Sequence, residues 1–179
     1  MAHLPSLPER AVLLDVFRAY PDTARPLLDY HEALMRGDSP LTVAERELIA
    51  AFVSALNACS YCHGVHQATA RRFGVAEGIL EGLLEDVETA AVEERLRPLL
   101  SYVAKLTVEP SRVGSHDAQA VMAAGWSEQA LFDSVAVCGL FNLMNRLVEG
   151  LGVAGDEQYF GVAADRLADG GYAGLKDLL

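Results

Sequence analysis

The stretch ERELIAAFVSALNACSYCHGVH, residues 45–66, decides how this sequence folds and where its chemistry is concentrated. Its first half repeats apolar side chains at helical spacing, namely Leu48, Phe52, Ala55 and Leu56. Thr42 and Glu45 stand just ahead of this repeat in the order of a capping box, in which a hydroxyl and a carboxylate satisfy free backbone N–H groups. The sequence therefore predicts a helix that begins after Thr42.

A second helix is predicted directly behind the first. Residues 57–58 interrupt the apolar repeat, and a new helix is expected to start near Cys59 and to stop at Gly74. Residues three or four apart share one face of a helix. Cys62 should therefore lie beside Cys59 at the helix start, with His66 one turn further along the same face.

This arrangement of two thiols and an imidazole favours thiol chemistry. A thiolate at a helix N-terminus is stabilised by the free N–H groups and by the helix dipole, and C-x-x-C motifs commonly use this effect to bring a thiol pKa toward neutrality. An imidazole one turn away can take or supply the proton. Glu47, on the preceding helix, is expected to orient His66 or to act through a water. Cys62, Cys59, His66 and Glu47 are the candidate catalytic residues.

Helical periodicity continues over nearly the whole chain, and no strand-like alternation persists over a useful length. We therefore predict an all-α, single-domain fold with the C-x-x-C at the start of a helix. Within it we expect an N-terminal arm and short helix over residues 1–20, a helical domain over 21–160 and a C-terminal tail over 161–179. The other expected helices are Glu9–Ala19, Pro21 to Gly37, Ala76–Leu84, Val92–Leu106, Ser115–Ala123, Glu128–Glu149 and a short one from about Asp156.

The segment Glu128–Glu149 is apolar on almost every side, which indicates a central helix or one face of an oligomer interface. Buried polar side chains need partners, so its polar stripe is expected to support the active site or to cross a subunit interface. That stripe consists of Asn142, Asn145, Arg146 and Glu149. Cys138 on the same helix is interpreted as an inert core thiol, and His31 as a satisfied buried histidine.

The composition excludes several classes of partner. The net charge is −11, from 25 acidic residues against 14 Lys and Arg, and a phosphate-binding surface needs clustered cations, so nucleic acid is not expected. No basic amphipathic stretch indicates a membrane surface, and no segment has the roughly 18 uninterrupted apolar residues of a spanning helix. The N-terminus shows no signal-peptide pattern. We expect a cytoplasmic location, where paired cysteines are more often catalytic or metal-binding than structural.

The spacing of Glu47, of the Cys59–Cys62 pair and of His66 resembles that of the AhpD-like alkylhydroperoxidases, which belong to the carboxymuconolactone decarboxylase superfamily. The resemblance covers roughly residues 20–160 and implies a helical AhpD-like domain there. Three further strings look like the branch usually called peroxidase-related proteins: LNACSYC (56–62), FNLMNR (141–146) and GLGV (150–153).

One position departs from the family pattern. The prototype hydroperoxidases carry a histidine just before the second cysteine, where this sequence has Tyr61. A histidine, His63, instead follows that cysteine, and on a helix it need not occupy the same place. The resemblance therefore does not carry the role of that histidine to this chain.

The resemblance also implies a mechanism. Cys62 would be the peroxidatic thiol, which attacks a hydroperoxide oxygen and becomes a sulfenic acid. Cys59 would resolve the sulfenic acid as a disulfide, with His66 and Glu47 as the proton relay. The substrate would be a small hydroperoxide, and an external dithiol or lipoyl-type protein would reduce the disulfide, with no cofactor or metal required. The protein would act in oxidative-stress defence as a homo-oligomer, either a dimer, a trimer or a hexamer.

Other interpretations of the same residues stay open at this point. The cysteines could be small buried hydrophobes, and Glu47 a solvated helix residue. Alternatively Cys59, Cys62, His66 and Glu47 could bind zinc, although structural zinc usually draws its ligands from two separated pairs. The superfamily's lactone branch suggests a decarboxylase, but that branch does not depend on a C-x-x-C. A non-catalytic redox sensor or helical interaction protein would oxidise its thiols once and signal.

Overall fold

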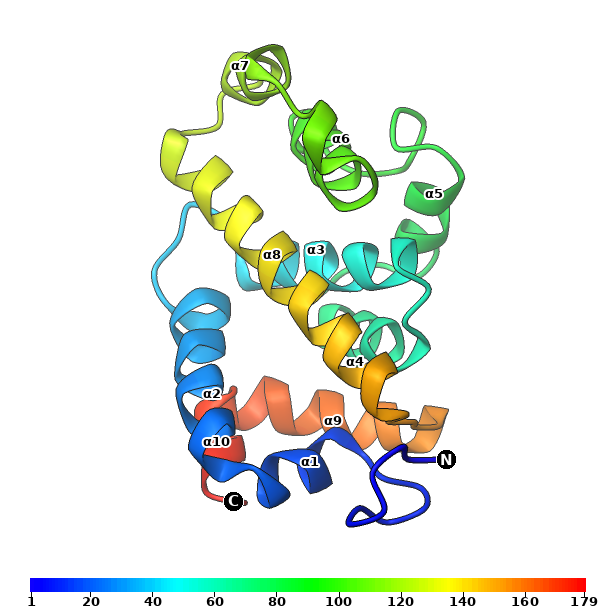
Figure 1. The fold of residues 1–179 in the computed structure, drawn as a ribbon. Coiled ribbons are helices and arrows are strands. Elements are labelled where there is room, and N and C mark those ends of the chain that lie inside the picture. Colours follow the sequence, from blue (N-terminus) through cyan, green and yellow to red (C-terminus); the bar gives the residue numbers. More distant parts are fainter.

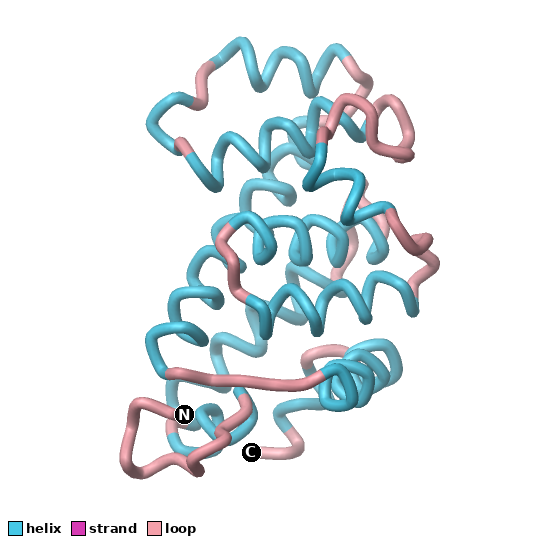
Figure 2. Tube along the Cα trace, turned by 90° about the vertical axis from the view of Figure 1, so that its right-hand side faces the viewer, coloured by secondary structure: helices cyan, strands magenta, loops and turns pink.

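The computed structural model describes all 179 residues, and it contains helices and loops but no strand (Figures 1 and 2). The predicted all-α fold is confirmed. The elements are α1 (Leu13–Ala19), α2 (Pro21–Arg36), α3 (Val43–Leu56), α4 (Ser60–Arg72), α5 (Ile79–Glu85), α6 (Leu96–Val108), the 3₁₀ helix η1 (Pro110–Arg112), α7 (Ser115–Ala123), α8 (Glu128–Leu151), α9 (Glu157–Gly170) and α10 (Ala173–Lys176).

Helix α3 is at the centre of the packing and contacts α2, α4, α5, α6 and α8. In Figure 1 the long helix α8 crosses α3 and α4 diagonally, and it packs on both. Helix α4 packs in turn along α9. The apolar side chains that these helices turn inward form one continuous core. The stretch 45–66, which spans α3 and the start of α4, therefore lies in the middle of the molecule.

The predicted cap at Thr42 is present, and Ser127 caps α8 in a similar way. The hydroxyl of Thr42 accepts a hydrogen bond from the backbone N–H of Glu45 at 3.1 Å, and the Glu45 carboxylate accepts from the backbone N–H of Thr42 at 2.7 Å. At the start of α8 the hydroxyl of Ser127 accepts from the backbone N–H of Ala130 at 3.2 Å. These bonds satisfy N–H groups that have no partner inside the helix. Helices α3 and α8 therefore begin directly after Thr42 and Ser127.

Three helices begin later than the sequence indicated, and α5 starts at Ile79 instead of Ala76. Helix α1 starts at Leu13, because the carboxylate of Asp15 accepts the backbone N–H of Val12 at 3.0 Å and so caps the helix there. Helix α6 starts at Leu96, which places Pro98 in its first turn. A proline is tolerated there because its missing N–H would have had no partner inside the helix.

Helix α8 has the length and hydropathy of a membrane-crossing helix, but half of its most apolar 18-residue window is buried inside the bundle. It packs against α2, α3, α4, α6 and α7. This is the central position that its sequence predicted. A long helix in the core of a helical bundle can be as apolar as a helix that crosses a membrane.

The C-terminal residues are part of the helical body. The boundary expected at residue 160 falls inside α9, which packs along α4, and α10 packs on α2 and α9. The carboxylate of Glu32 on α2 accepts hydrogen bonds from the backbone N–H groups of Tyr172 at 2.7 Å and Ala173 at 2.9 Å. The Tyr172 side chain is buried, so the segment expected to be a tail contributes to the interior.

Candidate active site

The turn between α3 and α4 places two thiols at the start of α4, as predicted. Ala58 adopts a left-handed conformation (φ 55°), which reverses the chain within a residue of the end of α3. Cys59 follows as the N-cap residue of α4, and its backbone N–H donates to the carbonyl of Ser54 at 2.9 Å. Cys62 lies in the first turn of α4.

The two thiols are reduced and buried, and they differ in their tendency to ionise. The pKa of Cys59 is lowered, because the Cys62 thiol and the Cys62 backbone N–H donate hydrogen bonds to its sulfur and together outweigh the effect of burial. The pKa of Cys62 is raised by the hydrogen bond that it donates and by burial. The charge of a singly ionised pair therefore resides on Cys59, at the positive end of the helix dipole.

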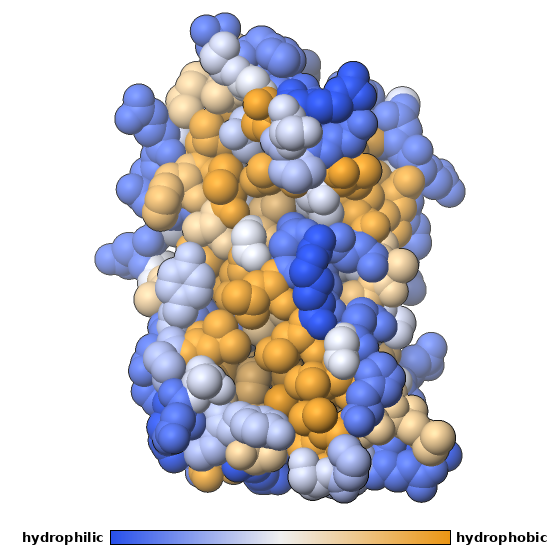
Figure 3. All heavy atoms as spheres, viewed as in Figure 1, coloured by the Kyte–Doolittle hydropathy of each residue, from blue (hydrophilic) through white to orange (hydrophobic).

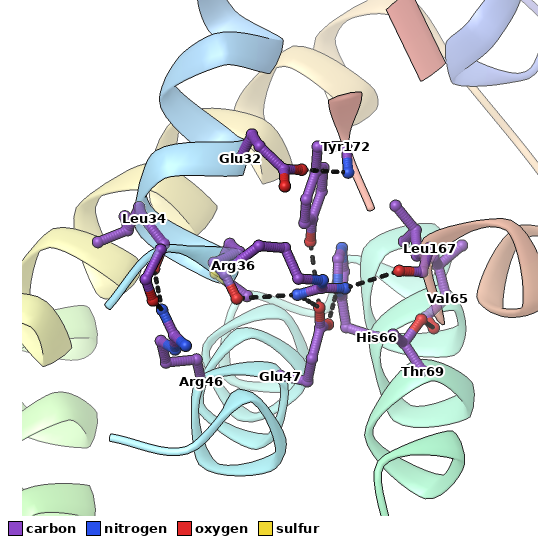
Figure 4. A network of polar contacts seen from close by, with 12 residues as sticks. Glu32, Leu34, Arg36, Arg46, Glu47, Val65, His66, Thr69, Leu167 and Tyr172 are labelled. Atoms are coloured by element: carbon purple, nitrogen blue, oxygen red, sulfur yellow. Dashed lines mark hydrogen bonds and ion pairs between the residues drawn. The ribbon is translucent and has the colours of Figure 1, made fainter. Parts of the chain in front are cut away.

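The carboxylate of Glu47 and the imidazole of His66 meet across α3 and α4 (Figure 4). Oε2 of Glu47 lies 2.7 Å from Nδ1 of His66, and the carboxylate is fully buried. This contact places the proton of a neutral imidazole on Nδ1 and leaves Nε2 as an acceptor. The structure thus joins two of the predicted site residues through Nδ1, so Nε2 of His66 is free of this contact.

Two residues that the sequence did not indicate complete the surroundings of Glu47 (Figure 4). Arg36, the last residue of α2, places Nη1 2.7 Å from Oε1 of Glu47 and donates from Nη2 to the carbonyl of Leu167 on α9 at 3.1 Å. The hydroxyl of Tyr172 donates to the same carboxylate oxygen at 3.4 Å. Burial alone would raise the pKa of Glu47, but the charges and hydrogen bonds of His66 and Arg36 outweigh it and lower the pKa. The carboxylate is therefore ionised.

An apolar cavity of about 70 Å³ reaches the thiol of Cys62 and the ring of His66. Its walls come from α1, α2, α4, α8, α9 and the start of α10, and 14 of its 17 lining residues are hydrophobic. The polar exceptions are His31, His66 and Arg166. Cys59 does not line the cavity and has no exposed surface. A small apolar molecule can thus reach Cys62 and His66 together, which is the usual character of a ligand site.

His31 is a satisfied buried histidine, as predicted, and it also lines the cavity. Its Nδ1 donates to the carbonyl of Leu27 at 2.7 Å, and its ring lies 4.9 Å from that of Tyr172 between centroids. Burial lowers the pKa of His31 from 6.5 to about 4. At neutral pH this ring is uncharged, so it adds no charge to the cavity wall.

Tyr61, which replaces the family histidine, has a packing role. Its hydroxyl donates to the hydroxyl of Tyr159 at 2.8 Å and accepts from the backbone N–H of Leu13 at 3.2 Å, which ties α4 to α9 and α1. His63 does not line the cavity, and its Nδ1 is buried without a hydrogen-bond partner. Neither residue is placed to supply the missing imidazole at Cys62.

The polar stripe on α8 supports the turn that carries the thiols. Asn145 is buried, donates to the hydroxyl of Ser54 at 3.0 Å and accepts from the side chain of Asn57 at 2.9 Å. Asn142 accepts a second hydrogen bond from Asn57 at 3.2 Å. These contacts fix α8 to the last residues before Cys59. Of the two roles expected for the stripe, these contacts fit support of the active site.

Two other interpretations are resolved by the geometry. Cys138 is buried beside the hydroxyl of Thr107 at 3.3 Å, and burial raises the pKa of its thiol, as expected for an inert core cysteine. No three His, Cys, Asp or Glu side chains are arranged to hold a metal ion. The carboxylate of Glu47 is instead engaged by Arg36 and His66. The zinc interpretation therefore finds no ligand set.

Sequence reasoning missed three residues around the thiols: Arg36, Tyr172 and Arg166. A buried carboxylate needs a cationic partner, so burial of Glu47 would have predicted an arginine or lysine beside it. With 14 such residues in the chain, nothing in the spacing selects Arg36. The other two lie beyond residue 160, in the part of the chain that the sequence assigned to a tail.

Fold and site together define an all-helical protein with a buried thiol pair beside a Glu–His pair, and known proteins share this fold. Residues 21–105 match the model of the carboxymuconolactone decarboxylase family. The solved structure of an uncharacterised peroxidase-related protein from Silicibacter sp. TM1040 is 27% identical, with a TM-score of 0.76 over 83% of this chain and 78% of that one. A peroxidase-related protein with an alkylhydroperoxidase AhpD core from Ralstonia eutropha JMP134 is 28% identical, with a TM-score of 0.75 over 81% of this chain and 76% of that one.

A variant of the debrominase Bmp8, solved in complex with 2,3,4-tribromopyrrole, shares the fold at 16% identity, with a TM-score of 0.69 over 93% of this chain and 81% of that one. No curated protein matches the sequence. The chain thus matches the carboxymuconolactone decarboxylase family over residues 21–105 and has an AhpD-like fold. The resemblance seen in the spacing of Glu47, Cys59, Cys62 and His66 is confirmed at the level of the family.

Proposed function

We propose that this protein is a thiol-dependent hydroperoxidase or disulfide reductase that works through Cys59 and Cys62. The observation that carries the proposal is a cavity that brings the thiol of Cys62 together with an imidazole oriented by an ionised carboxylate. The peroxidase-related proteins among the structures of this fold support a general antioxidant-type function and an enzyme.

In the proposed first step, Nε2 of His66 takes the proton of Cys62, directly or through one water. The Cys62 thiolate attacks the terminal oxygen of the hydroperoxide, and the O–O bond breaks. The departing alkoxide takes the proton from His66 and leaves as an alcohol, and Cys62 becomes a sulfenic acid. Glu47, held by Arg36, stabilises the imidazolium that forms in between.

In the second step the Cys59 thiolate attacks the sulfur of the Cys62 sulfenic acid. Hydroxide leaves, solvent returns to it the proton that Cys59 lost on ionising, and water and a Cys59–Cys62 disulfide remain. Two thiols and one hydroperoxide thus give one disulfide, one alcohol and one water. The attacking species in disulfide formation is the thiolate, and the position of Cys59 as the N-cap of α4 stabilises a thiolate there. An external dithiol, of the lipoyl type, would reduce the disulfide, and the cycle would run in the cytoplasm.

Counting free thiols tests the proposal. One equivalent of cumene hydroperoxide should lower the number of thiols that react under denaturing conditions from three to one, with Cys138 remaining free. In a Cys59→Ser variant the reaction should stop at a sulfenic acid on Cys62, which dimedone traps and mass spectrometry locates. In a Cys62→Ser variant neither remaining thiol should be lost. If wild-type protein keeps all three thiols, the peroxidase proposal fails.

Turnover separates the enzyme from a redox sensor. With dihydrolipoamide in excess, an enzyme consumes many equivalents of hydroperoxide, whereas a sensor is oxidised once and stops. A decarboxylase would act on a lactone carboxylate even after both Cys59 and Cys62 are changed to serine.

A further inference from the structure

We propose that the cavity takes an amphipathic substrate, a hydroperoxide with an apolar body and a carboxylate, and that Arg166 binds the carboxylate at the cavity mouth. This inference rests on the proposed function and narrows its substrate class. It is carried by the contrast between an apolar, uncharged interior and one unpaired cation at the outer end.

Most of the interior surface is apolar, and the tyrosine hydroxyls around it are already bonded: that of Tyr61 donates to that of Tyr159, and that of Tyr172 donates to Glu47. Apart from Arg166, the polar lining residues are His66, whose Nδ1 is held by Glu47, and His31, whose Nδ1–H is given to Leu27. A ligand group in this space gains most by being apolar, because burial of apolar surface is its main source of binding energy. The body of the substrate is therefore predicted to be a hydrocarbon chain or ring.

Arg166 lies on the exposed side of α9 and lines both the cavity and a more open hollow that adjoins it. The acidic side chains near it are already engaged. Asp165 is paired with Arg72 at 2.8 Å, and Asp156 caps α9 by accepting the backbone N–H of Tyr159 at 2.8 Å. Arg166 itself makes no ion pair or side-chain hydrogen bond, so all of its donors are free for a ligand.

The guanidinium of Arg166 lies close to the route to the thiol. Burial raises the pKa of Tyr159, opposed by the hydrogen bond from Tyr61 and by the charge of Arg166, and the carboxylate of Asp15 adds to the rise. Both charges therefore lie near the Tyr159 hydroxyl, but Asp15 is already engaged as the cap of α1, where it accepts the backbone N–H of Val12 at 3.0 Å. Tyr159 and Tyr61 line the same cavity as Cys62. An arginine can bind a carboxylate through two parallel hydrogen bonds. On a molecule with a net charge of −11, such an uncompensated cation selects an anion locally.

The test compares a short-chain hydroperoxy acid, matched to the small cavity, with its methyl ester, which keeps the apolar body and removes the charge. At low ionic strength the acid should oxidise wild-type Cys62 at least about fivefold faster than the ester, and salt should reduce this advantage. In Arg166→Gln the advantage of the acid over the ester should disappear. Arg25→Gln is the matched control, because Arg25 is exposed, makes no ion pair and does not line the cavity; it should behave as wild type.

Equal rates for acid and ester in the wild type would overturn the inference while leaving the peroxidase intact. So would an equal loss in the Arg25→Gln control. A second measurement does not need peroxidase activity. Mass spectrometry measures how strongly decanoate and decanol each protect Cys62 from alkylation by iodoacetamide. Stronger protection by decanoate that disappears in Arg166→Gln supports the anion site, and equal protection by the two ligands, or none, refutes it. Failure of the proposed function is seen separately, as no oxidation by any hydroperoxide.

Discussion

Arg36 and Glu47 form an ion pair with little access to water, since their side chains are 12% and 0% exposed and their atoms approach to 2.7 Å. Arg36→Met would leave an ionised carboxylate buried beside His66. Loss of one partner of a buried pair typically costs about 3–5 kcal/mol of the free energy of unfolding. We expect a loss of this size in urea denaturation, and a smaller one for Arg36→Lys, which keeps the charge.

A double variant checks that the loss comes from the stranded carboxylate. Arg36→Met combined with Glu47→Gln should be more stable than Arg36→Met alone, because the buried charge is removed with its partner. If Glu47→Gln lowers the free energy of unfolding by as much in Arg36→Met as in the wild type, the two side chains act independently and this account of the pair is wrong.

His31 makes the stability of the protein depend on pH. Because burial lowers its pKa from 6.5 to about 4, the unfolded chain binds a proton in this range that the folded protein does not. Stability therefore falls as the pH falls from 6.5 toward 4, by up to about 3 kcal/mol for this group, and the loss is complete below the folded pKa. Glu47, whose pKa is lowered from 4.5, adds its own loss only at more acid pH.

Urea denaturation at pH 6.5, 5.5 and 4.5 measures this dependence. His31→Gln should flatten the profile between these values, whatever its effect on stability at pH 7, because the amide does not titrate. His116→Gln, at an exposed histidine, should keep the slope of the wild type. A wild-type slope in His31→Gln would show that another group is responsible.

At the scale of the elements, Gly64 allows α4 and α9 to approach each other. A Cβ built at Gly64 would lie 2.4 Å from the ring of Phe160 on α9, far inside van der Waals contact. Helix propensity alone favours alanine over glycine by about 1 kcal/mol, but overpacking costs about 1–3 kcal/mol. We expect Gly64→Ala to lower the free energy of unfolding and to slow the oxidation of Cys62, because α9 forms part of the cavity wall.

The control for Gly64 is another glycine inside a helix. A Cβ at Gly161 on α9 would meet nothing within 4 Å, so Gly161→Ala should leave stability unchanged or raise it. Phe160→Leu should restore part of the stability that Gly64→Ala loses. If Gly64→Ala and Gly161→Ala raise stability equally, the close approach of α4 and α9 does not depend on the missing side chain at Gly64.

The elements that could be predicted are those whose signals are local. Thr42, Glu45 and Ser127 cap helices through residues three positions away, and the apolar repeat behind each cap marks the buried face. The late starts of α1 and α6, each four residues after the expected one, were missed because the carboxylate of Asp15 and the ring of Pro98 act within a single turn, and the apolar repeat does not mark that turn.

The residues of the candidate site also divide into those with a local sequence signal and those without one. Cys59, Cys62 and His66 lie within one helix start, and Glu47 is on the adjoining helix, so spacing alone could group them. Arg36 reaches Glu47 from the end of α2, and Tyr172 reaches it across 125 residues of sequence. Such contacts follow from how whole helices pack, which no local pattern records.

At the scale of the whole molecule, one face of α8 remains uncovered and apolar. Phe132 is 65% exposed and Leu143 is 51% exposed, and residues eleven apart lie within about 20° of each other around a helix. Figure 3, which shows the side of the molecule where α8 lies, has a band of hydrophobic surface along it. Exposed apolar surface of this kind commonly marks a contact with another protein, and the family resemblance implies a homo-oligomer.

We therefore predict that the chain associates with copies of itself through α8. Light scattering coupled to size exclusion should give a mass that is a multiple of 19.2 kDa. Leu143→Glu should shift the mass toward that of one chain, because it would bury a charge in the interface. Leu84→Glu, at an exposed leucine on α5, should leave the assembly intact. A wild-type mass of 19.2 kDa at micromolar concentration, or equal effects of the two substitutions, would rule out α8 as the contact.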